Sequence, residues 1–142
     1  MTKLAKLDFL LRYPAFTDTL LATRGVSWPI GAQPSVEEME AVESRMIRFK
    51  YGPWDERYYV LLGTLVGCEL AEVAKDRNSL TMRLTPAGME RAAEIASSRE
   101  WQIVDLRAEM LKQHFDKSGS TLKKIIYQEL PEVVNRPHRM EI

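Results

Sequence analysis

In most of this sequence apolar residues recur at the spacing of a helix, but in two short stretches every second residue is apolar. Residues 47–51 and residues 80–84 alternate apolar and polar side chains. Strict alternation predicts half-buried β-strands, because successive side chains of a strand point to opposite faces. A plain helical bundle does not need such stretches, so the fold must combine helices with a small sheet.

The other periodic segments have helical spacing. They cover residues 4–11, 14–20, 36–42, 55–68, 86–96, 101–115 and 120–130. A third short strand is expected at residues 70–74, forming a hairpin with residues 80–84. Thr85 followed by Pro86 is a helix-start signal, and Asp55 can cap the helix before the hairpin. The order of elements predicts a mostly helical α+β fold: a winged-helix domain with a short β-hairpin wing and C-terminal helices.

The length of 142 residues suits one domain, which we expect over residues 1–131. Residues 132–142 have little periodicity and contain Pro137, so we expect a flexible tail. Residues 25–34 carry two glycines and two prolines and predict a loop. Its Trp28 either folds back onto the core or serves a binding loop, and the sequence does not assign the loop a role.

The charge balance and the single cysteine exclude several classes of protein. Twenty Lys and Arg face twenty Asp and Glu, which argues against a generic polycationic nucleic-acid binder but leaves room for a local basic patch. Cys68 alone forms no disulfide within the chain, so we expect a cytoplasmic protein with this thiol buried. No apolar run approaches the ~18 residues of a membrane span, so no membrane partner is expected.

Catalytic patterns are sparse. His114 and His138 are the only histidines, and neither stands at a spacing that supplies a second metal ligand on one helix face. The sequence also lacks a glycine-rich phosphate loop. We therefore expect a non-enzyme without catalytic residues, metal or cofactor.

The helix expected after Gly52-Pro53 has the wrong charges for reading DNA. It begins with Asp55 and Glu56, its only strong cation is Arg57, and its body is apolar. Carboxylates facing phosphates cost electrostatic free energy, and DNA-reading helices offer donors instead. This pattern favours docking on a protein.

Four lysines form the densest basic cluster: Lys112, Lys117, Lys123 and Lys124. A helix N-terminus near residues 118–120 would add backbone N–H groups for an anion. Nucleic-acid phosphate contact is one interpretation. The alternative is that Ser120 caps the helix and the lysines form a solvated face.

Four stretches together resemble the small middle subunits of bacterial three-component ABC-ATPase systems, the Lamassu-like anti-phage defence assemblies. The stretches are residues 6–14, 49–58, 84–88 and 118–124, and the resemblance spans residues 4–131. The Leu-Thr-Pro-Ala-Gly piece at 84–88 is common in winged-helix proteins, whereas the first two are more distinctive. The resemblance implies a non-catalytic subunit that accompanies an SMC-like ATPase and helps to hold an effector, commonly a nuclease, inactive.

Within the second stretch a candidate docking patch comprises Tyr51, Pro53, Trp54, Arg57 and Tyr58. Aromatic residues and arginine are the usual anchors of interfaces, although Tyr51 and Trp54 can equally fill the core. The leading hypothesis is an adaptor docked on an SMC-like ABC ATPase. The alternatives are a winged-helix DNA-binding transcriptional regulator, dimeric through residues 101–115, and an enzyme whose site is assembled from scattered residues.

Overall fold

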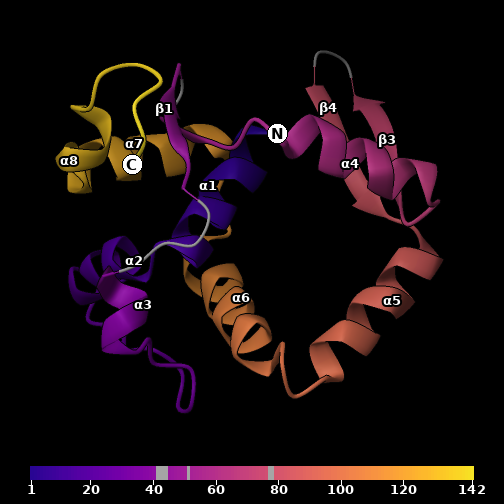
Figure 1. The fold of residues 1–142 in the computed structure, drawn as a ribbon, viewed down its shortest axis with the longest axis horizontal. Coiled ribbons are helices and arrows are strands. Elements are labelled where there is room, and N and C mark those ends of the chain that lie inside the picture. The colour runs from indigo at the N-terminus through magenta and orange to yellow at the C-terminus, as the bar shows by residue number, and fades with distance from the viewer. Residues whose placement is uncertain (41–44, 51, 77–78) are drawn as a thin grey trace. The chain divides into compact units, whose positions relative to one another are not determined.

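The computed structural model describes residues 1–40, 45–50, 52–76 and 79–142 (Figure 1). The helices are α1 (Thr2–Arg12), α2 (Pro14–Ala22), α3 (Val36–Glu40), α4 (Tyr58–Gly67), α5 (Pro86–Ser97), α6 (Gln102–Phe115), α7 (Gly119–Glu129) and α8 (Pro131–Val134). The strands are β1 (Ile47–Phe49), β2 (Gly52–Trp54), β3 (Ala71–Asp76) and β4 (Ser79–Leu84). The fold is mostly helical with two small antiparallel hairpins, which confirms the α+β class.

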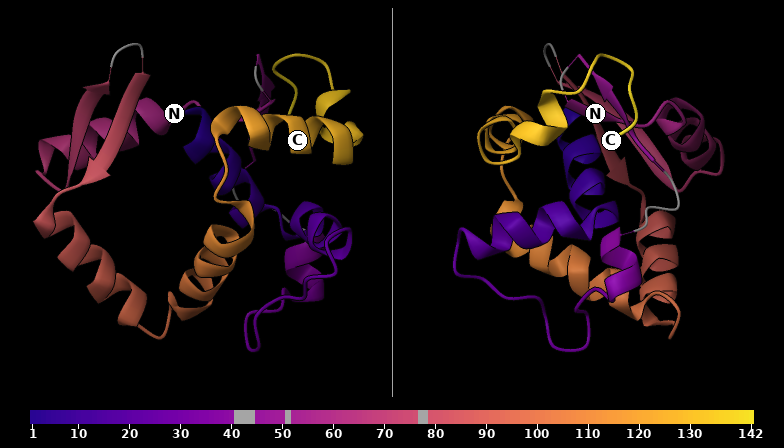
Figure 2. Two further views of the ribbon diagram at one scale, coloured as in Figure 1. Left: turned by 180° about the vertical axis from the view of Figure 1, so that it is seen from behind. Right: turned by 60° about the vertical axis from the view of Figure 1, so that its left-hand side comes forward.

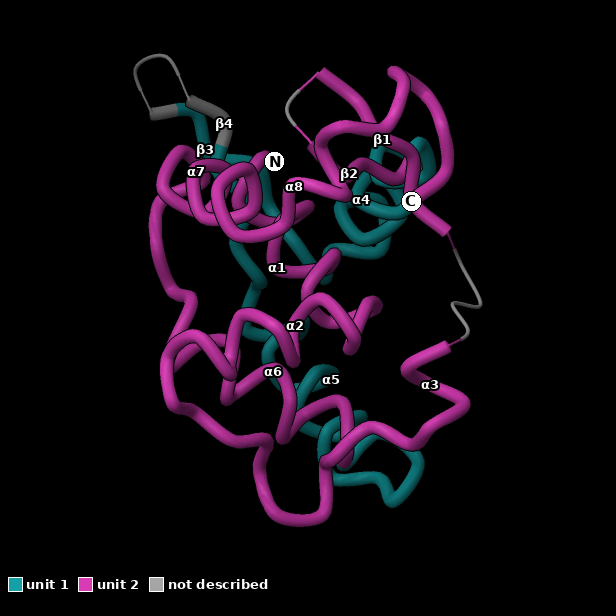
Figure 3. Tube along the Cα trace, turned by 90° about the vertical axis from the view of Figure 1, so that its left-hand side faces the viewer, with its two compact units in different colours: residues 1, 56–102 teal, residues 2–55, 103–142 magenta. Residues whose placement is uncertain are grey.

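The chain divides into two compact units (Figure 3). Unit 1 comprises Met1 and Glu56–Gln102, and unit 2 comprises Thr2–Asp55 together with Ile103–Ile142. Residues 2–55 pack mainly with residues 103–142, whereas residues 56–102 pack mainly with themselves. A single domain over residues 1–131 stays a prediction.

The core of unit 2 is built from the apolar faces of its helices. Phe9, Leu20, Phe115, Leu122 and Ile126 are fully buried. The Phe9 ring lies 4.9 Å from the Tyr13 ring and 5.5 Å from the Phe16 ring, between ring centroids. Phe9, Tyr13 and Phe16 are four and three residues apart in the sequence, so their rings lie on one side, which packs against the rest of the core.

Strands β1 and β2 form an antiparallel hairpin in which Ile47 pairs with Trp54 and Phe49 pairs with Gly52. The expected strand at 47–51 is present in part, and Tyr51 lies outside the described residues. Gly52 and Pro53, after which the sequence predicts a helix, instead belong to β2. Gly52 has a φ of +98°, a conformation open mainly to glycine, at the position that pairs with Phe49.

The C-terminal residues are held against β1. The amide of Arg48 donates to the carbonyl of Met140 over 2.8 Å, and the amide of Ile142 donates to the carbonyl of Met46 over 2.9 Å. Val133 is fully buried and Ile142 is nearly so. The structure thus places the expected flexible tail in contact with unit 2, because two apolar side chains reach the core and the backbone pairs with a distant strand.

Unit 1 contains α4, the hairpin β3–β4 and α5, and α4 lies against the hairpin (Figure 2). The register runs from Ala71 opposite Leu84 to Asp76 opposite Ser79. The two strands are those that the sequence predicts. The helix-start signal is confirmed too, since the Thr85 hydroxyl accepts from the amide of Gly88 over 3.0 Å. Among the described residues no helix is long and apolar enough to cross a bilayer.

Candidate protein-interaction surface

Helix α4 combines an apolar composition with high exposure. Its ten residues include no charged side chain, and no side chain caps its N-terminus. A helix that is hydrophobic on all sides is ordinarily buried. In this structure Tyr59 and Val60 are each 71% exposed and Leu61 is 48% exposed. Contiguous exposed apolar faces are typical of surfaces that contact another molecule.

The hairpin and α5 extend the exposed apolar area of unit 1. Val73, Leu84 and Met89 are exposed, and Ile95 is exposed further along α5. Among the apolar side chains described in unit 1, those of Tyr58 and Ala71 are buried. A segment of this size cannot bury much surface by itself, so its apolar faces are available to another polypeptide. We call the exposed side chains of Tyr59, Val60 and Leu61 the α4 surface.

The candidate docking patch is divided between the two units. Pro53 is buried and Trp54 half-buried in β2, which belongs to unit 2. Arg57 is exposed at the N-cap of α4, and Tyr58 is the buried first residue of that helix in unit 1. Tyr51 lies outside the described residues.

Asp55 does not cap α4, so this part of the prediction is wrong. Its carboxylate is buried in unit 2, 2.7 Å from the Arg12 guanidinium, which also pairs with Asp8 over 2.6 Å. Arg57 occupies the N-cap position instead. The negative charge expected at the start of the helix is therefore reduced to that of Glu56. An ion pair that spans 43 residues leaves no local signal in the sequence.

The predicted lysine cluster is spread over two helices and the link between them. Lys112 near the end of α6 pairs with Glu109 over 3.2 Å, and the Lys123 ammonium lies 5.1 Å from the centroid of the Tyr127 ring. Lys117 and Lys124 are exposed.

The serine that caps α7 is Ser118 and not Ser120. The Ser118 hydroxyl accepts from the amide of Thr121 over 3.1 Å. Beside it, Lys3 pairs with Asp116, and this hydrogen bond from the ammonium holds the pKa of the Asp116 carboxyl below its usual value. Part of the positive charge near the cluster is therefore matched by a carboxylate.

The loop at residues 25–34 is fixed by Arg107, a residue that the sequence analysis missed. The Arg107 guanidinium donates to the Ala32 carbonyl over 2.9 Å and to Glu38 over 2.8 and 3.0 Å. It also lies 5.5 Å from the centroid of the Trp28 ring, whose Nε1 donates to Asp18 over 2.8 Å. Trp28 therefore folds back on unit 2. Hydrogen bonding from Arg107 lowers the pKa of Glu38.

Lys6 is a second buried cation without a local sequence signal. Its ammonium donates to the Pro53 carbonyl over 3.1 Å. Burial, and then the charge of Lys123, lower the pKa of Lys6 to about 8. The side chain is closed off from solvent, so this lysine supports the packing of α1 on β2 and offers no accessible nucleophile.

Two further features of the described part of the chain bear on chemistry: its metal-ligating side chains and its cysteine thiol. No group of three His, Cys, Asp or Glu side chains there could hold a metal ion. Cys68 is exposed at the C-cap of α4, whereas the sequence analysis expected it to be buried. Comparisons of the chain with protein-family models, with curated proteins and with solved structures find no match.

Proposed function

We propose that this chain is a non-catalytic adaptor that docks on a larger protein through the α4 surface. The observation that carries the proposal is a helix with no charged side chain whose Tyr59 and Val60 are mostly exposed. Interface cores are depleted of charge and enriched in aromatic residues, which matches this helix. Covering it with an apolar partner surface removes the exposed area from water at no cost in charge desolvation.

Unit 1 is proposed to be a winged-helix-type module. The order of helix, hairpin and helix in unit 1 supports this proposal, in which α4 would be the recognition helix and β3–β4 the wing. A recognition helix presents hydrogen-bonding and cationic side chains to base edges and phosphates. Because α4 contains no cation, its chemistry favours docking on protein over the DNA-binding transcriptional regulator.

The partner that the sequence resemblance suggests is an SMC-like ABC ATPase, with an effector such as a nuclease as the third component. In this proposal the adaptor contributes no catalytic group, and it acts in the cytoplasm in anti-phage defence. Its task is to connect the ATPase to the effector and to help keep the effector inactive until the ATPase responds.

Co-purification tests the proposal. The chain is co-expressed with a tagged SMC-like ATPase, which the proposal expects to be encoded beside it, and the amount recovered with the tag is measured for wild type and two variants. Val60→Glu places a charge in the α4 surface and is expected to abolish recovery. Val36→Glu is the matched control, because Val36 is 72% exposed in α3 of unit 2, and it is expected to be recovered like the wild type.

Circular dichroism melting checks that both variants are folded. Equal recovery of Val60→Glu and wild type would place the contact elsewhere and contradict the proposal. A sequence-specific footprint of the isolated chain on a duplex operator, lost in Val60→Glu, would overturn it in favour of the regulator.

A further inference from the structure

A second surface, in unit 2, concentrates positive charge that no continuous stretch of the sequence reveals. Residues 45–50 contribute Arg45, Arg48 and Lys50, and residues 136–142 contribute Arg136 and Arg139. Glu141 is the only Asp or Glu in the two segments. We call these five cations the β1 basic surface. In a chain with no net charge they form a local excess.

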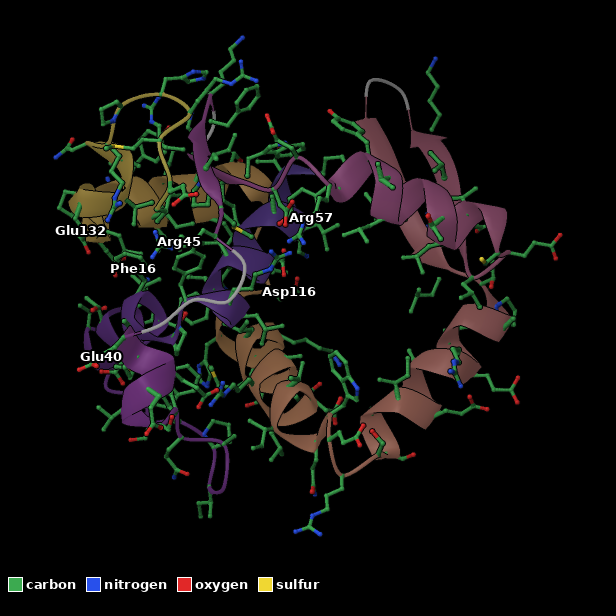
Figure 4. The ribbon with its side chains drawn as sticks, in the orientation of Figure 1. Phe16, Glu40, Arg45, Arg57, Asp116 and Glu132 are labelled. Carbon is green, nitrogen blue, oxygen red and sulfur yellow. The ribbon has the colours of Figure 1, made fainter. Side chains whose placement is uncertain are left out.

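Backbone hydrogen bonds hold the two segments side by side. The amide of Arg139 donates to the carbonyl of Arg48 over 2.6 Å, the amide of Arg48 donates to Met140, and Ile47 forms a bridge with Glu141. Figure 4 shows nitrogen-tipped side chains gathered around β1 and the loop that follows α8. Residues some 90 positions apart in the sequence thereby share one surface.

Glu141 carries the one carboxylate within the two segments, and it pairs with Arg45. A carboxylate oxygen of Glu141 lies 3.0 Å from the Arg45 guanidinium. Arg136 instead donates to the backbone carbonyl of Glu141 over 2.8 Å. Burial raises the pKa of Tyr13, and the charges of Arg45 and Arg136 both act against that rise, which places the two cations near the same phenol. The Glu141 carbonyl accepts a hydrogen bond from Arg136 but does not neutralise its positive charge.

Arg48 is held by packing. Its side chain is half-buried, and its Nε is buried without a hydrogen-bond partner. No carboxylate of the described residues forms an ion pair with it. A guanidinium that is already immobilised loses little side-chain entropy when an anion binds.

Aromatic rings line the same hairpin. The rings of Phe49 and His138 lie 5.2 Å apart and those of Phe49 and Trp54 lie 6.1 Å apart, between centroids. His138 is exposed, and the other two are half-buried. Aromatic rings beside a positively charged track are the features with which proteins bind single-stranded nucleic acid, because bases stack on the rings and phosphates contact the cations.

We propose that the hairpin β1–β2 and the loop at residues 136–142 bind single-stranded nucleic acid. Phosphates contact Arg48, Arg136 and Arg139, and a base stacks on the exposed face of His138. The surface is built from a hairpin and a loop, without the helix that commonly enters a major groove, which favours a single strand over a duplex. This inference does not rest on the proposed adaptor function, because it uses other residues in the other unit.

Fluorescence anisotropy with a labelled oligo(dT) of about 20 nucleotides tests the proposal. Arg136→Gln/Arg139→Gln is expected to weaken binding about tenfold or more and to reduce the salt slope by about 0.7 per lost phosphate contact. Lys112→Gln/Lys124→Gln is the matched control: it removes two exposed cations from α6 and α7, and its affinity is expected to stay within about twofold of wild type.

His138→Ala separates stacking from charge. It is expected to weaken oligo(dT) binding about fivefold or more while leaving the salt slope unchanged, because it removes a ring and no phosphate contact. Circular dichroism checks that each variant is folded. Absence of binding by the wild type at low salt, an equal loss in both double variants, or equal affinity for a duplex of the same length would each overturn the proposal.

Discussion

Replacing Gly88 by alanine tests how closely α5 is seated on the rest of unit 1. A Cβ at this position would lie 1.8 Å from the carbonyl oxygen of Leu70 and 2.8 Å from its carbonyl carbon, where ordinary contact begins at 3.4 Å. The start of α5 would have to withdraw by about 1.6 Å. The obstacle is backbone, which cannot rotate away as a side chain can.

The cost follows from what this withdrawal disrupts. The amide of Thr85 donates to the Leu70 carbonyl over 3.1 Å, and the Thr85 hydroxyl donates to the Glu69 carbonyl over 2.7 Å. Losing two such hydrogen bonds costs about 2 kcal/mol, and overpacking adds about 1–3 kcal/mol. We expect Gly88→Ala to destabilise unit 1 by about 3–5 kcal/mol, a large part of the stability of a small domain.

Gly63→Ala is the matched control, because Gly63 lies inside α4 and a methyl group added there would meet nothing within 4 Å. It should stabilise the helix by about 0.5–1 kcal/mol. Amide hydrogen exchange read by mass spectrometry resolves the two units. Peptides from α4 and α5 should lose protection in Gly88→Ala, while those from α1 and α7 keep it. Protection of α5 within about 0.5 kcal/mol of wild type would refute the reasoning.

Three further outcomes are expected. Burial and the charge of Lys123 lower the pKa of Lys6 from 10.5 to about 8 in the folded chain, so the unfolded chain binds more protons between these values. Stability measured by urea unfolding should therefore rise by up to about 3 kcal/mol from pH 8 to pH 10.5, and Lys6→Met should abolish this rise. Arg12→Met removes the guanidinium from buried Asp55 and should cost about 3 kcal/mol in thermal melting. Arg107→Lys removes the two-point contact with Glu38, so NMR titration should show the pKa of Glu38 returning towards its ordinary value.

Most of the secondary structure of unit 1 can be predicted from local sequence signals. The alternation at residues 80–84 and the Thr85-Pro86 pair define β4 and the start of α5, because both depend on neighbouring residues alone. The exposure of Cys68 is not predictable in this way. An apolar run does not show which of its faces is covered, and only the packing of α4 on the hairpin decides that.

Unit 2 is harder to predict because its contacts join distant parts of the chain. The pairing of residues 139–142 with β1, the ion pair of Arg12 with Asp55 and the clamp of Arg107 on Glu38 all span 43 residues or more. Gly52-Pro53 suggests the end of a strand, yet both residues belong to β2, where Gly52 pairs with Phe49. The candidate sites follow the same rule: the lysines at 112–124 are visible as a run, whereas the β1 basic surface exists only once the two segments are paired.

The interrupted sequence of unit 2 has a consequence during protein synthesis. Residues 2–55 leave the ribosome before Glu56–Gln102, and their packing partners at 103–142 follow only afterwards. At ~5–20 residues per second, the first half waits for roughly 2–10 s with the apolar sides of Phe9 and Leu10 uncovered. The nascent chain thus exposes apolar surface during that interval, and slowing translation across the codons of unit 1 should lower the yield of folded protein.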